Sequence, residues 1–206
     1  MVRQRSRDPR WLRTRGALAT SILELASQKP VWDVSFADLA SNSGIERSTV
    51  YKHVTSSMDF LIEVLVEELT QTFERFRVEA LEAPSYSSRV RGMRLLLEMV
   101  LLRQAIYRQG GRESNYSVLN QVMERHLHDR HLYLVKQGYF LLSSHVVENE
   151  SGAEMAAWFI TDGISGSIKG WLDTSEQPDI DVFMQFHALI PPEWWHSESD
   201  RLGQIR

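Results

Sequence analysis

Apolar residues recur along the chain at the three- and four-residue spacing that is typical of amphipathic helices. The longest stripe covers residues 60–76, about five helical turns, and shorter stripes cover residues 18–26 and 36–40. No alternation with a period of two persists, and no repeat of fixed length is present. The pattern therefore predicts an all-α protein.

The same spacing predicts where the helices lie. An early helix is expected at residues 9–28, and a long one is expected to begin at Ser57. Later helices are predicted at residues 86–109, 115–127, 132–148, 153–172 and 180–190. Breaks between these helices are indicated by Pro84, Gly110–Gly111, Ser151–Gly152 and Gln177–Pro178.

Residues 35–53 show the pattern of two short helices joined by a tight turn. Ser35 precedes an apolar run and Asp38 follows three residues later, which predicts a capping box. Gly44 stands where the first helix should end, because glycine adopts the left-handed conformation at little cost. Glu46 then opens a second short helix at residues 47–53. Two short helices around a glycine turn predict a helix-turn-helix.

The second short helix is rich in side chains that suit nucleic acid. Val50 and Val54, four residues apart, are expected to face inward. The remaining faces hold Arg47, Ser48, Thr49, Tyr51, Lys52 and His53. Arginine and lysine pair with guanine edges or phosphates, and hydroxyl, phenol and imidazole groups bond phosphate oxygens. We interpret this helix as a reader of double-stranded DNA; the polar face of an ordinary surface helix is the alternative.

The distribution of charge favours the same interpretation. The 206-residue chain has a net charge of -4, yet residues 1–55 hold nine Lys+Arg against five Asp+Glu. Six of these cations are arginines within the first fifteen residues. A basic front end on an acidic body is typical of a nucleic-acid reader attached to another domain. A solvated basic tail would show the same charge, so the helix-turn-helix pattern decides between them.

Several classes of protein are disfavoured by what the sequence lacks. The chain has no cysteine, which excludes disulfides, thiolate metal sites and a cysteine nucleophile. We find no phosphate-binding glycine loop and no nucleophile elbow, so we expect no enzyme and no cofactor. No apolar run approaches the roughly 20 residues that span a bilayer, and the basic start is too long for a secretory signal. We expect a cytoplasmic protein without a membrane partner.

The stretch VSFADLASNSGIERSTVYKHVTSSMDFLIEVL resembles the DNA-binding region of the TetR family of bacterial transcriptional regulators. The resemblance rests on Ser35, Ala40, Gly44 and Tyr51 in the family's order and spacing, and it covers about residues 12–66. The form IERSTVYKH is closest to the branch that includes dihydroxyacetone-kinase regulators. The resemblance implies a ligand-responsive regulator, most often a repressor.

The resemblance also implies a division of the chain. A three-helix DNA-binding domain is expected at residues 9–57, behind a basic arm at residues 1–8. A helical effector-binding and dimerisation domain is expected at residues 58–206. The implied partners are a near-palindromic DNA operator, a small-molecule effector of unknown identity and a second copy of the chain. The effector would release the dimer from the operator by changing the spacing of its two reading heads.

Two positions depart from the family pattern. The family usually has an aromatic residue where Val54 stands and a lysine, which supports a DNA phosphate, where Ser57 stands. Ser57 is expected to offer a neutral hydroxyl bond, with arginines of residues 3–15 replacing the lost charge. The expected DNA-binding residues are Ser35, Arg47, Ser48, Thr49, Tyr51, Lys52, His53 and Ser57.

The body offers candidates for effector binding and for dimerisation. The resemblance implies an effector pocket among the middle helices, where the candidates are Leu102, Arg103, Ile106, Tyr107, Tyr116, Val122, Tyr133, Phe140, Trp158 and Phe159. The predicted ligand-binding residues among them are Arg103, Tyr107, Tyr116, Tyr133, Trp158 and Phe159. Arg103 could counter an anionic ligand or reach solvent, and aromatic residues at helical spacing also form ordinary core. Gly163, Gly166 and Gly170 would let a partner helix approach closely. The apolar surface of this helix would comprise Ile160, Ile164, Ile168, Trp171 and Leu172, and ordinary packing within a monomer is the alternative.

A metal site is the alternative from another class. Glu124, His128 and His131 share one helical face within ERHLHDRH, and carboxylate and imidazole groups bind zinc and other divalent ions. The alternative function is therefore a small helical metal-binding protein or metalloenzyme. Arg125 and Arg130 would oppose a cation there, so a charged helix with solvent-facing histidines is favoured.

Overall fold

The computed structural model describes residues 8–82, 86–109, 117–137, 140 and 142–187, and of residues 75–82 and 86–89 it describes the backbone alone. The described residues are mostly helical, with no strand among them. The all-α fold class predicted from the apolar spacing is confirmed. None of the described helices is both long enough and apolar enough to cross a membrane.

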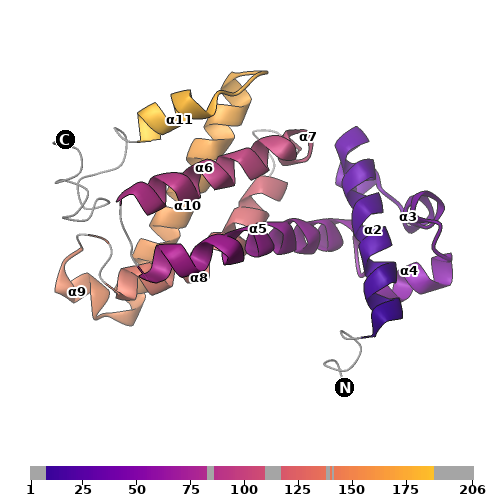
Figure 1. Ribbon diagram of the computed structural model, residues 1–206, viewed down its shortest axis with the longest axis horizontal. Coiled ribbons are helices and arrows are strands. Elements are labelled where there is room, and N and C mark those ends of the chain that lie inside the picture. The colour runs from indigo at the N-terminus through magenta and orange to yellow at the C-terminus, as the bar shows by residue number, and fades with distance from the viewer. Residues whose placement is uncertain (1–7, 83–85, 110–116, 138–139, 141, 188–206) are drawn as a thin grey trace.

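A small unit of helices, the head, lies at the N-terminal end of the molecule (Figure 1). It consists of α2 (Pro9–Gln28), the 3₁₀ turn η1 (Val31–Asp33), α3 (Phe36–Ser43) and α4 (Arg47–His53). Asp8 begins α2 by accepting a hydrogen bond from the Arg10 amide at 2.8 Å. The helices enclose fully buried Leu18, Ile22 and Leu39, so the head has a core of its own.

The turn between α3 and α4 has the predicted local geometry. Ser35 accepts a hydrogen bond from the Asp38 amide at 3.1 Å, and the Asp38 carboxylate accepts one from the Ser35 amide at 2.9 Å. These two bonds complete the capping box. Gly44 ends α3 at φ 68° and ψ 15°, a left-handed conformation that favours glycine. The helix-turn-helix predicted from these residues is therefore present.

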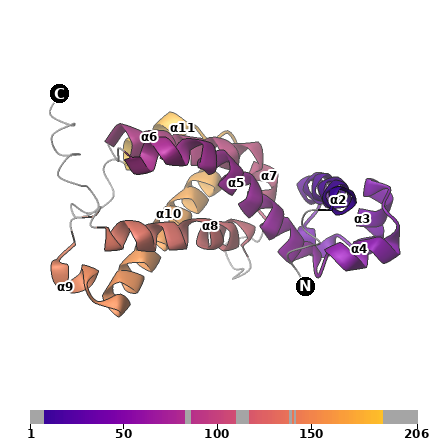
Figure 2. The same ribbon diagram turned by 60° about the horizontal axis from the view of Figure 1, so that its bottom comes forward.

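The long helix α5 (Ser57–Glu82) runs from the head into the body (Figure 1). The body also contains α6 (Tyr86–Leu102), α7 (Gln104–Tyr107), α8 (Val118–Lys136), α9 (Ser144–Val147), α10 (Glu150–Thr174) and α11 (Ile180–His187). Helices α5 and α6 pack together, and α8 packs closely on α10 (Figure 2). The helix α5 therefore joins the head to the body.

Two predicted helix boundaries in the body are wrong. Residues 86–109 do not form one helix, because the backbone leaves the helical conformation at Arg103 (φ -117°, ψ 23°) between α6 and α7. The break predicted between helices at residues 115–127 and 132–148 is also wrong, because α8 runs without interruption from Val118 to Lys136. Leu127, His131 and Val135 lie four residues apart and are all buried, so one apolar face continues past the predicted break.

Candidate nucleic-acid interface

Helix α4 has a buried apolar face and exposed polar faces, as predicted. Val50 and Val54 are 0% and 3% exposed and pack into the head. On the other faces Arg47, Ser48, Tyr51 and Lys52 are exposed, and Thr49 and His53 are half-buried. A seven-residue helix thus presents two cations, hydroxyls and an aromatic side chain to solvent. This is the chemistry that positions a helix on phosphates and base edges.

Tyr51 is held in place by contacts on both sides of its ring. The Arg47 guanidinium donates a hydrogen bond to the Tyr51 hydroxyl at 3.2 Å, and its carbon lies 5.8 Å from the ring centre. Phe36 on α3 packs edge-on against the same ring at 4.9 Å between centroids. The arginine and the tyrosine are therefore preorganised as a pair, although the tyrosine is 57% exposed.

His53 closes the far end of α4 against α2. Its ring stacks on Trp11 with 5.1 Å between centroids. Burial, together with the positive charges of Arg15 and Lys52, lowers the pKa of His53. The lowered pKa favours the neutral ring, and its Nδ1 atom has no hydrogen-bond partner among the described residues. A neutral imidazole at this position can act as a hydrogen-bond donor or acceptor toward a ligand.

Ser35 and its surroundings fix the start of α3. The Asp38 carboxylate that completes the capping box also accepts a hydrogen bond from Lys29 at 2.8 Å. The Lys29 bond and the Ser35 bonds lower the pKa of Asp38 to about 2. The side chain of Ser35 is exposed, but its hydroxyl bonds Asp38, so its first role is to cap the helix.

Ser57 differs from the other predicted DNA-binding residues. Its side chain is 9% exposed, and its hydroxyl donates a hydrogen bond to the Val34 carbonyl at 2.6 Å. The hydroxyl is therefore engaged inside the head, where it ties the first turn of α5 to the segment ahead of α3. This placement corrects the expectation that the Ser57 hydroxyl faces a phosphate.

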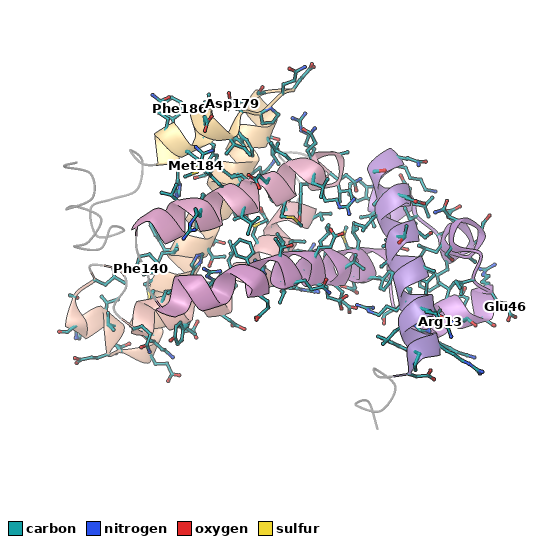
Figure 3. All side chains as sticks on the ribbon, in the orientation of Figure 1. Arg13, Glu46, Phe140, Asp179, Met184 and Phe186 are labelled. Atoms are coloured by element: carbon teal, nitrogen blue, oxygen red, sulfur yellow. The ribbon has the colours of Figure 1, made fainter. Side chains whose placement is uncertain are left out.

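The predicted basic arm divides into two parts. Residues 1–7 lie outside the described residues. Arg15 bonds Glu63 at 3.5 Å and also Glu67, and its guanidinium lies 5.2 Å from the Phe60 ring. This arginine therefore joins α2 to α5 and is not part of a free arm. Arg13 remains exposed on α2, at the same end of the molecule as Glu46 and far from Phe186 (Figure 3).

The predicted effector residues do not gather in the interior of the body. Arg103 donates two hydrogen bonds to Glu68 on α5, at 2.8 and 3.2 Å, so its charge is already paired. Tyr107 is 4% exposed, and burial raises the pKa of its phenol. Tyr133, Trp158 and Phe159 are 50%, 37% and 61% exposed. Tyr116 lies outside the described residues. These exposed fractions place the three aromatic side chains at the surface of the protomer.

The proposed metal ligands also point to different partners. His131 is buried, and its Nδ1 atom lies 2.9 Å from the Thr161 hydroxyl on α10. His128 lies against the Trp158 ring at 4.1 Å, and its Nε2 atom lies 3.2 Å from a Glu154 oxygen. Glu124 is exposed. Across the described residues no three acidic, histidine or cysteine side chains form a metal-binding group, so the metal alternative is not favoured.

Helices α10 and α11 both carry exposed apolar side chains. Met155 and Phe159 on α10 and Val182 and Phe186 on α11 are 46–73% exposed. Gly166 continues the α10 face, and a β-carbon built there meets nothing within 4 Å. The apolar residues predicted for this surface, Ile160, Ile164 and Ile168, are instead 0–6% exposed, because this side of α10 packs within the body.

Gln109, at the end of the α7 segment, was not predicted from the sequence. Its side-chain amide donates hydrogen bonds to the Ala26 carbonyl and, at 3.2 Å, to the Lys29 carbonyl. Its carbonyl oxygen accepts a hydrogen bond from the Val31 amide at 3.0 Å. One body side chain thus satisfies three backbone groups at the end of α2. Because the contact joins residues about 80 positions apart, no local sequence pattern predicts it.

Comparison with known proteins supports the fold. No protein-family model matches the sequence, and no curated protein matches it. Among solved structures, a protein from Syntrophomonas wolfei str. Goettingen that is assigned to the TetR family of transcriptional regulators is similar. The TM-score is 0.62 at 19% identity, with 85% of this chain and 93% of that chain covered. The chain therefore has a TetR-like all-α fold; its assignment to the dihydroxyacetone-kinase regulator branch stays a prediction.

Proposed function

We propose that this protein is a ligand-responsive transcriptional regulator that binds a near-palindromic DNA operator as a homodimer. The observation that carries the proposal is α4, a short helix whose outer faces present Arg47, Ser48, Tyr51 and Lys52. The likeness in fold to a protein assigned to the TetR family supports it. Such a protein works in the cytoplasm, where the DNA is, and most regulators of this type are repressors.

In this proposal the residues of the head divide into base readers, phosphate contacts and positioning residues. Arg47 and Lys52 reach guanine edges or phosphates, and Ser48 and Thr49 allow close approach to the groove. Tyr51 bonds a phosphate while Arg47 and Phe36 hold its ring. His53 lies at the edge of this surface and bonds a phosphate oxygen through its neutral imidazole, and Ser35 is a positioning residue, because its hydroxyl already bonds Asp38. Ser57 is a positioning residue, because its hydroxyl bonds the Val34 carbonyl.

The homodimer forms through the exposed apolar side chains of α10 and α11. Met155, Phe159, Val182 and Phe186 supply apolar area, and Gly166 allows the backbone of a partner helix to come close. Two helices from each copy then form a four-helix interface. A two-fold dimer places two copies of α4 about one DNA turn apart, which is why the operator is expected to be near-palindromic.

The effector acts by changing how the heads are held. The head is joined to the body by α5 and by the Gln109 bonds to the end of α2. An effector that binds better to a body conformation with altered head spacing releases the DNA, because linkage requires a difference in affinity between the two states. Induction, with the effector releasing a repressor, is the proposed direction.

Fluorescence anisotropy tests the proposal. Labelled DNA from upstream of the protein's own gene is titrated with purified full-length protein at two salt concentrations, against scrambled DNA of equal length. We expect a preference of about a thousandfold or more for the upstream DNA and a steep salt dependence. Equal and weak binding to both DNAs would contradict a sequence-reading function at this promoter.

A further inference from the structure

Between α5 and α8 lies a cation that has no counter-ion among the described residues. Arg130 on α8 is partly buried, and its guanidinium carbon lies 5.4 Å from the centre of the Phe73 ring on α5. No described residue brings a carboxylate or a hydrogen-bond acceptor to this guanidinium. Buried charges are normally paired, because removing a charge from water is costly. The unpaired state of Arg130 therefore needs an explanation.

A second unused donor lies one helical turn away. His126 faces the same Phe73 ring at 5.2 Å between centroids. The Thr70 hydroxyl lies 3.4 Å from His126 Nδ1, and we assign the hydroxyl as the donor, which leaves the imidazole proton on Nε2. Nε2 is buried and has no partner among the described residues. Burial, and the nearby charge of Arg130, lower the pKa of His126 to about 4, so the ring is neutral at pH 7.

Three acids on the neighbouring helices contact other basic side chains. Glu68 on α5 holds Arg103, and Glu67 on the same helix holds Arg15. Glu154 on α10 lies against His128. These described carboxylates are therefore not available to Arg130. The pair offers two kinds of N–H donor and one uncompensated positive charge, which together suit an anion.

We propose that Arg130 and His126 bind the carboxylate of the effector, and that the effector is a small organic acid. A guanidinium can bond both oxygens of a carboxylate, and His126 Nε2 supplies a further donor from the same face of α8. This proposal rests on the ligand-responsive function proposed above and names the chemical class of its ligand. It also moves the anion-binding role from Arg103, which Glu68 neutralises, to Arg130.

The position of the pair connects binding to the DNA-reading head. Phe73 and Thr70 belong to α5, whose first turn lies under the head. An anion bound to α8 beside these residues changes how α8 packs against α5. Helix α5 then carries the change to the head. Whether the ligand weakens or strengthens DNA binding depends on which packing of α8 against α5 it favours.

Isothermal titration of full-length protein without DNA tests the ligand class. The probes are sodium benzoate and sodium octanoate, each compared with its neutral amide, benzamide or octanamide. We expect each acid to bind at least tenfold more tightly than its amide. We also expect Arg130→Gln to remove this preference, Arg130→Lys to retain part of it, and Arg125→Gln, an exposed position on the same helix, to leave it unchanged.

Three results would overturn the proposal. These are equal affinity for acids and amides, an unchanged preference in Arg130→Gln, or an equal loss in Arg125→Gln. Melting temperatures of the variants check folding, and Arg130→Lys keeps the test valid because it preserves the charge and most of the side-chain bulk. DNA binding of the ligand-free protein is measured separately, so a failure to bind DNA counts against the proposed function and a failure to prefer acids counts against the organic-acid site.

Discussion

Removing the Gln109 side chain should detach the end of α2 from the body. Gln109→Ala removes three hydrogen bonds, to Ala26, Lys29 and Val31, and leaves these backbone groups to find other partners. At a net contribution of about 1 kcal/mol for each bond, the free energy of unfolding should fall by roughly 2–4 kcal/mol. For a chain of this length, that change lowers the melting temperature by roughly 5–10 °C.

Hydrogen exchange at the Val31 amide measures the effect locally. The Gln109 oxygen is its hydrogen-bond acceptor, so this amide should lose most of its protection in Gln109→Ala. Gln109→Glu keeps an acceptor for Val31 but turns a carboxylate oxygen toward the Ala26 and Lys29 carbonyls, so it should be at least as destabilising. Gln137→Ala, an exposed position at the end of α8, serves as the control. Wild-type protection at Val31, with an unfolding free energy within about 0.5 kcal/mol of wild type, would refute the role of Gln109 in joining the head to the body.

Three further predictions concern the DNA surface, the dimer face and His131 on α8. Replacing both Arg47 and Tyr51 by alanine should weaken operator binding, measured by anisotropy, about a hundredfold or more, since each base or phosphate contact contributes about 1–3 kcal/mol. Unchanged affinity would show that α4 is not part of the DNA interface. Gly166→Leu should give a folded monomer in sedimentation velocity, because the new side chain projects into open space on the dimer face. The control Gly16→Leu, equally open but on α2, should remain dimeric. A dimeric Gly166→Leu protein would place the interface elsewhere. Burial lowers the pKa of His131 to about 3, so the stability gained from the neutral ring is complete above pH 6.5 and is lost as the pH falls toward 3. The free energy of unfolding should therefore fall by about 2 kcal/mol between pH 7 and pH 5. Urea unfolding should show a weaker pH dependence for His131→Gln, and an identical dependence would contradict this assignment.

The head could be predicted from sequence because its signals are local. Ser35 and Asp38 are three residues apart, Gly44 needs only its own backbone, and the inward faces of Val50 and Val54 follow from helical spacing. The capping box, the left-handed glycine and the buried valines are all confirmed in the structure. The role of Ser57 could not be read in the same way, because its hydroxyl bonds a carbonyl 23 residues earlier in the chain.

The body was predicted less well because its contacts are distant in sequence. Arg103 pairs with Glu68 across 35 residues, and the sequence near either residue does not indicate its partner. The α8 break was wrongly predicted because a polar stretch, ERHLHDRH, hides a buried face that includes His131. Packing between helices decides which side of α10 is inside, so Ile160 was assigned to a surface although the structure buries it.

Selection from a random pool of double-stranded DNA tests the central claim most directly. Full-length protein is incubated with the pool at near-physiological salt, and bound DNA is sequenced over several rounds. The account predicts enrichment of a near-palindromic site with half-sites about one helical turn apart, bound by an even number of protomers and lost when Arg47 and Tyr51 are both alanine. A pool that shows no enriched sequence, or the same enrichment with the double variant, would contradict the assignment of α4 as a DNA-reading helix.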